Sequence, residues 1–316
     1  MCDVYVVAGP TASGKTAVAV ELAKEVGGEV ISADSMQVYR EMDIGTAKPA
    51  EEEKQGIRHH LIDVCCPSEP FSVAEYKKQA DCAISDVLSR GKTPILAGGT
   101  GFYINAVLYD AEFGEVSQAE TDKLRNQFLH EASLHGEVFL HNKLQQVDPV
   151  SAKQIHPNNV QRVCTALAFF YLTGEMFSVH NKRQKSKPLK WKTAFYLLEH
   201  PRVELYERIN ARTIKMFEMG FIDEVKHLLQ KGYGDAKPMQ GIGYKEVALY
   251  LNNHCTYDDM VLSMQKATRN YAKRQITWFN NQVSWARKIQ ASNKTASQIA
   301  LLLCRNVDFL PAIDRT

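Results

Sequence analysis

The chain has 316 residues, of which 45% are hydrophobic and 23% charged, so it is long and apolar enough to bury a sizeable core and is not a disordered chain. Its 38 lysines and arginines nearly balance 36 aspartates and glutamates. The resulting net charge of +2 does not by itself indicate a nucleic-acid partner, so any RNA surface has to come from local clustering of basic residues.

Cysteine usage and hydropathy place the chain in a reducing compartment. The seven cysteines are odd in number and form no C-x-x-C pair, which is typical of free thiols. No stretch reaches the roughly 18 apolar residues of a membrane span, and the first residues lack a basic segment followed by an apolar one. We therefore expect a cytoplasmic protein with no membrane partner.

Short apolar strands alternate with helices in the first third of the chain. The patterns predict strands at 4–8, 29–32 and 94–97, with a further candidate at 58–64. Helices are predicted at 15–26, at 71–90 and from about residue 102. Alternation in this order predicts an α/β fold with a parallel sheet and right-handed crossovers.

The pattern then changes to helix after helix. Residues 118–175 contain no convincing strand, and residues 180–190 are polar and basic, as in a connection. A strand is predicted again at 193–198, and the remainder is mostly helical. The sequence thus predicts a core made of 1–111 and 191–316, with an inserted all-helical domain at 112–190.

A phosphate-binding loop follows the first strand. Residues 9–16, GPTASGKT, satisfy G-x-x-x-x-G-K-[ST] between a strand and a helix, where the mechanism requires it. Its backbone amides and the helix N-terminus suit a phosphate, and the core is therefore expected to be P-loop NTPase-like. The predicted phosphate-binding residues are Gly9, Pro10, Thr11, Ala12, Ser13, Gly14, Lys15 and Thr16, with the Thr16 hydroxyl on a phosphate-held Mg²⁺.

Two further segments follow strands at the same expected edge of the sheet. Asp34 comes directly after the second strand, where a carboxylate can hold magnesium through water or act as a base, or can form an Asx-turn or an N-cap. Thr100 closes the turn GGT, where it either contacts phosphate or caps the next helix.

Two predicted helices near the C-terminus carry basic residues. Arg208 and Arg212 share one face, which suits a pyrophosphate or an RNA backbone, although pairing with neighbouring glutamates on a solvated surface is the alternative. In 266–280, KATRNYAKRQITWFN, cations alternate with aromatic rings. That composition suits single-stranded RNA, and an amphipathic helix with a packed tryptophan is the alternative.

The motifs taken together resemble the bacterial tRNA dimethylallyltransferases. The resemblance runs from the P-loop to about Asn280 and stands on GPTASGKT, ISADSMQVYREMDIGTAKP, RHHLIDV, LAGGTGFY, HPNNVQR, RINART, QGIGYKE and TRNYAKRQITWF. It implies transfer of a dimethylallyl group from dimethylallyl diphosphate to N6 of the adenosine on the 3′ side of the anticodon. The alternatives are a P-loop kinase and an RNA-binding protein without activity.

The resemblance also assigns roles to residues. It implies that Asp34 is the general base, that Arg212 stabilises the diphosphate, and that Thr100 lies near the diphosphate and the adenine. It implies that the insertion clamps the anticodon stem-loop, and we expect a monomer. The tRNA contacts it implies are Asp34, Ser35, Met36, Gln37, Thr100, Arg125, Arg162, Gln240, Gly241, Ile242, Gly243, Tyr244, Lys245, Lys273, Arg274, Gln275, Ile276, Thr277, Trp278, Phe279 and Asn280.

The chain departs from the family pattern in two RNA-contact segments. Thr165 and Ala168 stand where arginine and glutamate are usual, and Asn280 stands where arginine is usual. These departures affect individual RNA contacts more than the reaction.

Overall fold

The computed structural model describes residues 3–111 and 118–305. Its contacts divide the chain into two compact units, one running up to Leu108 and resuming at Lys190, the other running from Tyr109 to Leu189. Residues 112–117, with which the predicted insertion at 112–190 begins, lie outside the described residues. So do Cys2 and the last residues of the core predicted at 191–316. Each unit is described by itself.

The first unit is built on one sheet. Its strands, among the described residues, are β1 (Val4–Ala8), β2 (Gly28–Ser32), β3 (His59–His60), β4 (Thr93–Gly98), β5 (Thr193–Glu199) and β6 (Arg287–Gln290). They lie in the order β3-β2-β4-β1-β5-β6, and every pair is parallel. Parallel strands place all their carboxyl ends at one edge, so the segments after β1, β2, β4 and β5 meet there.

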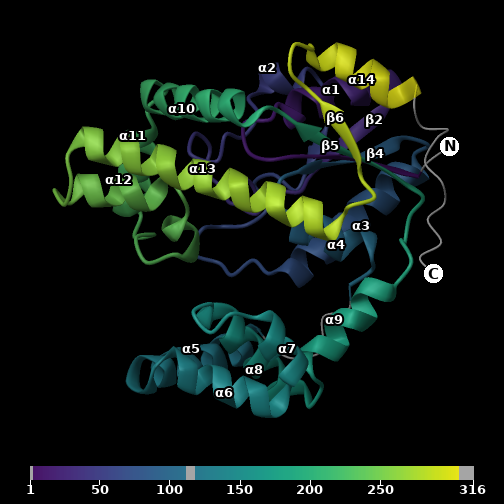
Figure 1. Cartoon of the computed structure of the whole chain (residues 1–316). Coiled ribbons are helices and arrows are strands. Elements are labelled where there is room, and N and C mark those ends of the chain that lie inside the picture. Colours follow the sequence, from purple (N-terminus) through teal and green to yellow (C-terminus); the bar gives the residue numbers. More distant parts are fainter. Residues whose placement is uncertain (1–2, 112–117, 306–316) are drawn as a thin grey trace. The chain divides into compact units, whose positions relative to one another are not determined.

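Both faces of the sheet are covered by helices, as an all-parallel sheet requires (Figure 1). One face packs on α1 (Lys15–Val26) and α14 (Ala296–Arg305), with Leu22 and Ile299 among the buried side chains. The other face carries α3 (Val73–Ser89) and α4 (Gly101–Leu108), joined by the stacked rings of Tyr76 and Tyr103. A short helix, α2 (Glu51–Lys54), precedes β3.

A second core lies between the C-terminal helices and the loop after β2. The elements are α10 (Arg202–Glu218), α11 (Phe221–Gln230), the 3-10 turn η1 (Lys237–Gln240), α12 (Tyr244–Leu251) and α13 (Tyr257–Gln282). Val38 and Met42 of the loop pack there with Phe221 and Tyr244. The loop that carries Asp34 is thereby attached to helices about 200 positions later in the sequence.

One carboxylate joins this loop to α11. Glu224 accepts hydrogen bonds from the amides of Asp43 (2.9 Å), Ile44 (2.6 Å) and Gly45 (3.2 Å). It also accepts one from the Tyr244 hydroxyl, at 2.7 Å. Hydrogen bonds from several amides to one ionised group fix the course of a loop that has no regular structure of its own.

The second unit is helical throughout its described residues. It contains α5 (Gln118–His135), α6 (Glu137–Val147), α7 (Pro149–Gln154), α8 (Val160–Thr173) and α9 (Phe177–Ser186) around a core that includes Phe128, Leu140 and Leu167. The buried carboxylate of Asp148 accepts bonds from the amides and hydroxyls of Ser151 and Ser178, which ties α7 to α9.

The structure corrects three predictions of local structure. The candidate strand at 58–64 is a strand only at His59–His60, and the predicted connection at 180–190 is helical as far as Ser186. Strand β6 was not expected at all. Its sequence, RKIQ, has no apolar run because it is a short edge strand with partly exposed side chains.

The apolar helices of the described residues are short or bent. No single helix is long and apolar enough. Val160–Thr173 and Phe177–Gln184 pass by length and composition only when they are joined, and they are bent by 93°. Val163, Cys164, Ala166, Leu167 and Ala168 of this pair are buried in the core of the second unit.

Candidate active site

The P-loop has the conformation that phosphate binding requires. Gly14 is left-handed, with φ of 82°, and α1 begins at Lys15, so the free amides of the helix N-terminus lie directly after the turn. Ser13 is 2% exposed, and its hydroxyl has no hydrogen-bond partner among the described residues. A buried, unpartnered hydroxyl within an amide-lined loop fits a phosphate oxygen.

Three charged groups share this site. Burial lowers the pKa of Lys15 to about 8, while the negative charge of Asp34 raises it and Arg212 lowers it further. The pKa of Arg212 is also lowered by burial and is raised by Asp34. Both cations therefore feel the carboxylate of Asp34, which places it on the same side of the sheet as the P-loop.

Helix α10 contacts the P-loop with both of its predicted arginines. Arg212 donates to the hydroxyl of Thr11, and Arg208 donates through Nε to the carbonyl oxygen of Ala12, at 2.8 Å. Glu204, the alternative partner of Arg208, is bonded instead to His200 and Ser292. The shared face of α10 thus contacts the phosphate loop, and its arginines are not hydrogen-bonded to Glu204.

His200 is a site-forming residue that the sequence did not single out. Its Nε2 lies 3.0 Å from the carbonyl oxygen of Ser13, and its Nδ1 lies 2.8 Å from the carboxylate of Glu204. It directly follows β5, at the carboxyl edge of the sheet. That position was the available signal, because polar residues after parallel strands collect at the ligand edge.

Asp34 and Thr100 come together through Ser35. Asp34 accepts a bond from the amide of Met36 at 2.9 Å, so it forms an Asx-turn and also faces the cations. The Thr100 hydroxyl accepts from the Ser35 amide at 3.1 Å and lies 3.4 Å from the Ser35 hydroxyl. The turn after β4 therefore braces the turn after β2.

Two residues of α13 enter this site: Gln275, which the resemblance assigned to RNA, and Tyr271, which the sequence did not single out. Gln275 is 6% exposed and is bonded to the backbone of Thr11 and Gly99. Burial, with a smaller contribution from the negative charge of Asp34, raises the pKa of Tyr271 to about 12. The helical pattern places Gln275 on the apolar stripe with Ala272 and Phe279, and a glutamine on such a stripe was the available signal.

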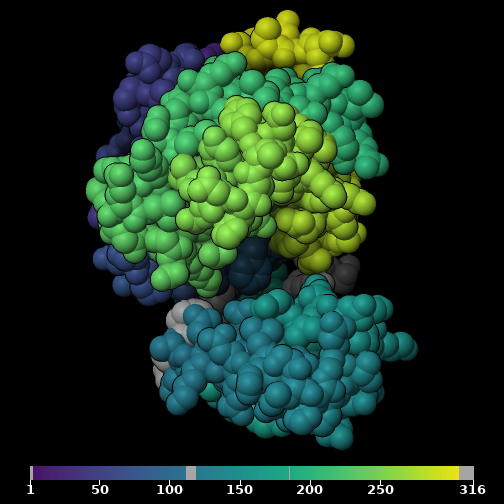
Figure 2. Space-filling model, turned by 90° about the vertical axis from the view of Figure 1, so that its left-hand side faces the viewer, coloured from purple at the N-terminus to yellow at the C-terminus, as the bar shows by residue number. Residues whose placement is uncertain are grey.

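The remaining predicted RNA residues of the first unit divide by exposure. Gln37 bonds the backbone of Thr46 and Ala47, Tyr244 is wholly buried, Phe279 packs on Phe195, and Trp278 lies against α4. Those with exposed side chains are Gln240, Lys245, Lys273, Arg274, Ile276, Thr277 and Asn280. Helices α10, α11, α12 and α13 form the green to yellow-green surface in Figure 2.

In the second unit, the predicted RNA residues Arg125 and Arg162 lie on the adjacent helices α5 and α8. Arg162 is exposed, and Arg125 donates to Gln161 at 3.1 Å while its Nε is buried without a partner among the described residues. Ala168 is wholly buried in the helical core, and the Thr165 hydroxyl bonds the Gln161 carbonyl. Ala168 therefore lies away from the exposed surface.

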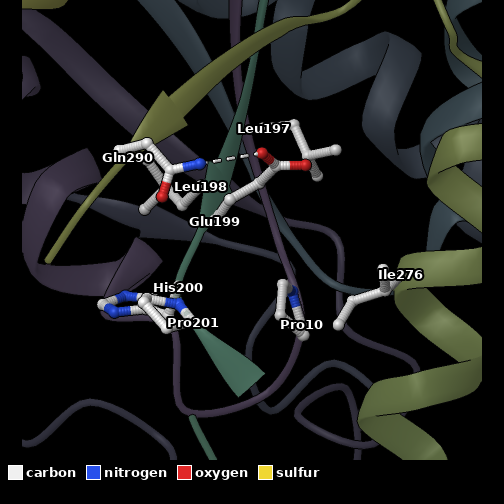
Figure 3. A pocket seen from close by; sticks show the side chains of 8 residues that line it. All are labelled: Pro10, Leu197, Leu198, Glu199, His200, Pro201, Ile276 and Gln290. Atoms are coloured by element: carbon white, nitrogen blue, oxygen red, sulfur yellow. Dashed lines mark hydrogen bonds between the residues drawn. The ribbon is translucent and has the colours of Figure 1, made fainter. Parts of the chain in front are cut away.

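A cavity of about 290 Å³ adjoins the P-loop at Pro10 (Figure 3). It is lined by Pro10, Leu197, Leu198, Glu199, His200, Pro201, Ile276 and Gln290. Gln290 donates to Glu199 at 3.2 Å across its rim. Because β5 and β6 lie on the opposite side of β1 from β2 and β4, the cavity is not where Asp34 and Thr100 meet.

The described residues contain no group of three or more His, Cys, Asp or Glu that could hold a metal ion. Cys65, Cys66, Cys82, Cys164, Cys255 and Cys304 are all free thiols. The described site offers a P-loop, two cations, a carboxylate and hydroxyl groups.

Comparison with known proteins shows the family and the fold. The chain is 47% identical over 292 residues to a tRNA dimethylallyltransferase of Acetivibrio thermocellus, covering 91% of this chain and 92% of that one. A tRNA isopentenylpyrophosphate transferase structure from Staphylococcus epidermidis superposes with a TM-score of 0.71 at 38% identity, covering 96% and 98% of the two chains. A eukaryotic dimethylallyltransferase solved acting on tRNA superposes with a TM-score of 0.78 at 30% identity, covering 96% of this chain and 78% of that one. The IPP transferase model matches residues 37–282, and the chain belongs to that family.

Proposed function

We propose that this chain transfers the dimethylallyl group of dimethylallyl diphosphate to N6 of the adenosine at position 37 of tRNA, with Asp34 as the general base. The tRNA dimethylallyltransferase activity follows from the family. The observation that carries the role of Asp34 is a set of contacts. Ser35, the next residue, bonds Thr100, and Gln275 bonds both Gly99 and Thr11 of the P-loop. The negative charge of Asp34 also acts to raise the pKa of Lys15 and of Arg212.

The diphosphate is held on the P-loop. The loop suits a ligand with several oxygens and negative charge. It offers the amides after Gly14, the hydroxyl of Ser13 and the ammonium group of Lys15. Arg212, bonded to Thr11, adds a second cation. Negative charge grows on the diphosphate as the allylic C–O bond breaks, so cations fixed beforehand stabilise the transition state more than the ground state.

The adenine is held beside Asp34 and Thr100. As the N6–C1 bond forms, the electron pair of the C1–O bond leaves with the diphosphate, and the N6 proton passes to Asp34. The Asx-turn fixes one carboxylate oxygen of Asp34 on the Met36 amide, which leaves the other oxygen for the substrate. The Thr100 hydroxyl, hydrogen-bonded to Ser35, lies where it can position the adenine.

The residues present fit a magnesium ion carried mainly by the diphosphate. Magnesium prefers oxygen ligands and is commonly bound through substrate phosphates with few protein groups. Thr16, the second residue of α1, supplies a hydroxyl oxygen next to Lys15. The absence of a carboxylate cluster among the described residues agrees with that arrangement. When bound, the ion supplies further charge stabilisation to the leaving diphosphate.

The tRNA is bound by the exposed basic and polar residues. Lys273, Arg274 and Asn280 of α13, with Lys245 of α12, contact RNA of the anticodon loop, and Arg162 of the second unit contacts its stem-loop. The target adenosine is flipped out of the loop, because its N6 is not accessible to Asp34 within a stack. The helical unit clamps the stem-loop, and one chain carries the whole site.

A reaction with purified protein tests the function. The protein is incubated with unmodified tRNA transcript and dimethylallyl diphosphate, and the digested nucleosides are measured by mass spectrometry. We expect dimethylallyladenosine at position 37 only when both substrates are present. Phosphorylation of a nucleotide or metabolite with ATP, with no prenylated tRNA, would instead establish the P-loop kinase alternative.

A further inference from the structure

The side chain of Gln275 joins two glycine turns of the active site. Its Oε1 accepts the amide of Thr11 at 2.8 Å, and its Nε2 donates to the carbonyl oxygen of Gly99 at 2.9 Å. Both bonds are buried. One amide therefore connects the loop after β1 to the turn after β4.

The side-chain amide of Gln275 is tightly packed against Gly99. A Cβ at Gly99 would lie 2.3 Å from Nε2 of Gln275 and 3.1 Å from the carbonyl oxygen of Gly9, so no larger residue fits while Gln275 holds its place. Gln275 itself is 6% exposed, between neighbours Arg274 and Ile276 that are exposed. Its side chain is thus not available to RNA.

The contacts continue on both sides of the amide. On the donor side, the hydroxyl of Thr11 accepts a hydrogen bond from Arg212. On the acceptor side, Gly99 is followed directly by Thr100, whose amide donates to the carbonyl oxygen of Ala33 and whose hydroxyl accepts the amide of Ser35. Hydrogen bonds and the short Gly99–Thr100 segment therefore connect the arginine of the diphosphate site to the residue after Asp34.

We infer that Gln275 is a positioning residue, not a tRNA contact: it sets the separation between the loop that holds the diphosphate and the turn that holds the adenine. This inference rests on the proposed function. In a transfer between two bound substrates, the distance between the reacting atoms depends on the distance between their two sites. A misplacement of about 1 Å is enough to cost roughly 100-fold in rate.

Replacement of Gln275 by leucine tests the role by removing both hydrogen bonds while keeping an uncharged side chain of similar length. We expect kcat to fall by about 10- to 100-fold. The Kd for tRNA should stay within about twofold, because the side chain makes no surface contact. Gln265→Leu is the matched control: Gln265 is on the same helix, bonds only the backbone of Asn210, and should leave kcat unchanged.

Gln275→Glu adds a pH readout that a packing role would not produce. The ionised carboxylate cannot donate to the Gly99 carbonyl, whereas the protonated acid can both accept from Thr11 and donate to Gly99. Burial raises the pKa of such a carboxyl group, so part of the population is protonated at mildly acidic pH. The ratio of variant to wild-type kcat/KM should rise as pH falls.

The melting temperature of each variant establishes whether the variant is folded. If Gln275→Leu does not fold, the kcat values of Gln275→Glu and Gly99→Ala test the positioning role instead. Wild-type kcat in folded Gln275→Leu overturns the inference, as does a flat pH ratio for Gln275→Glu. A raised Kd for tRNA with unchanged kcat would mean that Gln275 contacts tRNA and would overturn the inference. A wild-type protein that prenylates no tRNA is a separate outcome, which removes the proposed function itself.

Discussion

The guanidinium group of Arg212 is bonded to the hydroxyl of Thr11, although the two residues are separated by 201 positions in the sequence. The contact brings a partly buried cation to the P-loop, where negative charge develops on the diphosphate in the proposed reaction. We expect Arg212→Ala to lower kcat by about 100- to 1000-fold, the usual effect of removing one fixed group that stabilises developing charge. Steady-state kinetics with dimethylallyl diphosphate measure this.

Arg202→Ala is the control for this substitution. Arg202 begins the same helix, but it donates to Tyr206 and stacks on its ring, and so is expected to leave kcat near the wild-type value. Equal losses in the two variants would mean that α10 contributes through folding alone.

The pKa of Lys15, lowered to about 8 by burial, predicts a pH-dependent affinity for the diphosphate. The free enzyme binds the anion well when Lys15 is charged, which holds below pH 8. As pH rises through 8, the ammonium group loses its proton and affinity falls. Calorimetric titration with dimethylallyl diphosphate between about pH 7 and pH 9.5 should show the decrease.

Lys15→Arg should remove that dependence, because arginine keeps its charge throughout this range. Affinity that is flat from pH 7 to 9.5 in the wild type would contradict a lysine that titrates near pH 8 in the free enzyme.

Asp34→Asn keeps the shape of the side chain and its bond to the Met36 amide but removes the base. We expect kcat to fall by about 100- to 10,000-fold, the range for loss of a positioned general base. The Kd for tRNA should change little. The measurement is single-turnover prenylation together with filter binding of labelled tRNA, and a variant with near-normal kcat would assign the proton transfer to another group.

Glu224 is expected to matter for stability because it satisfies three loop amides and the Tyr244 hydroxyl. Glu224→Ala leaves these partly buried donors without their acceptor and should lower the free energy of unfolding by about 2–3 kcal/mol. Urea denaturation measures it. Glu218→Ala, at an exposed position of α10, is the control and should change stability by less than about 0.5 kcal/mol.

Lys273 is exposed on α13 and is proposed to contact phosphate. Lys273→Ala should weaken tRNA binding and reduce the slope of log Kobs against log salt by about one, since one phosphate contact is lost. Lys294→Ala removes an equal charge from the segment before α14 and should leave the slope unchanged. Identical slopes for Lys273→Ala and the wild type would place Lys273 outside the RNA interface.

Much of the sheet could be predicted because its central strands are apolar on both faces. The bounds of β1 and α1 are those the sequence predicts, and β2, β4 and β5 differ by no more than one residue at either end. The P-loop was predictable for a different reason, since its backbone conformation fixes glycine and lysine at set positions. Strand β6 has neither signal.

The site was predictable only where a residue follows a strand. Asp34, Thr100 and the P-loop share that position, so the sheet brings them together. Gln275 does not, because its partners Thr11 and Gly99 lie 264 and 176 positions away, and no local pattern encodes a buried polar contact of that range. The resemblance assigned Gln275 to RNA because the motif around it is otherwise exposed and basic.

The contact between Thr11 and Gln275 also has a consequence for biosynthesis. A ribosome has translated the P-loop, the Asp34 turn and Thr100 long before it reaches codon 275, so the nascent chain exposes a phosphate loop whose Thr11 amide still lacks its partner. Diphosphate-binding parts are thus made first, and the residue that sets their spacing is made almost last. A truncated chain released before α13 would carry every P-loop residue and still lack the geometry for transfer.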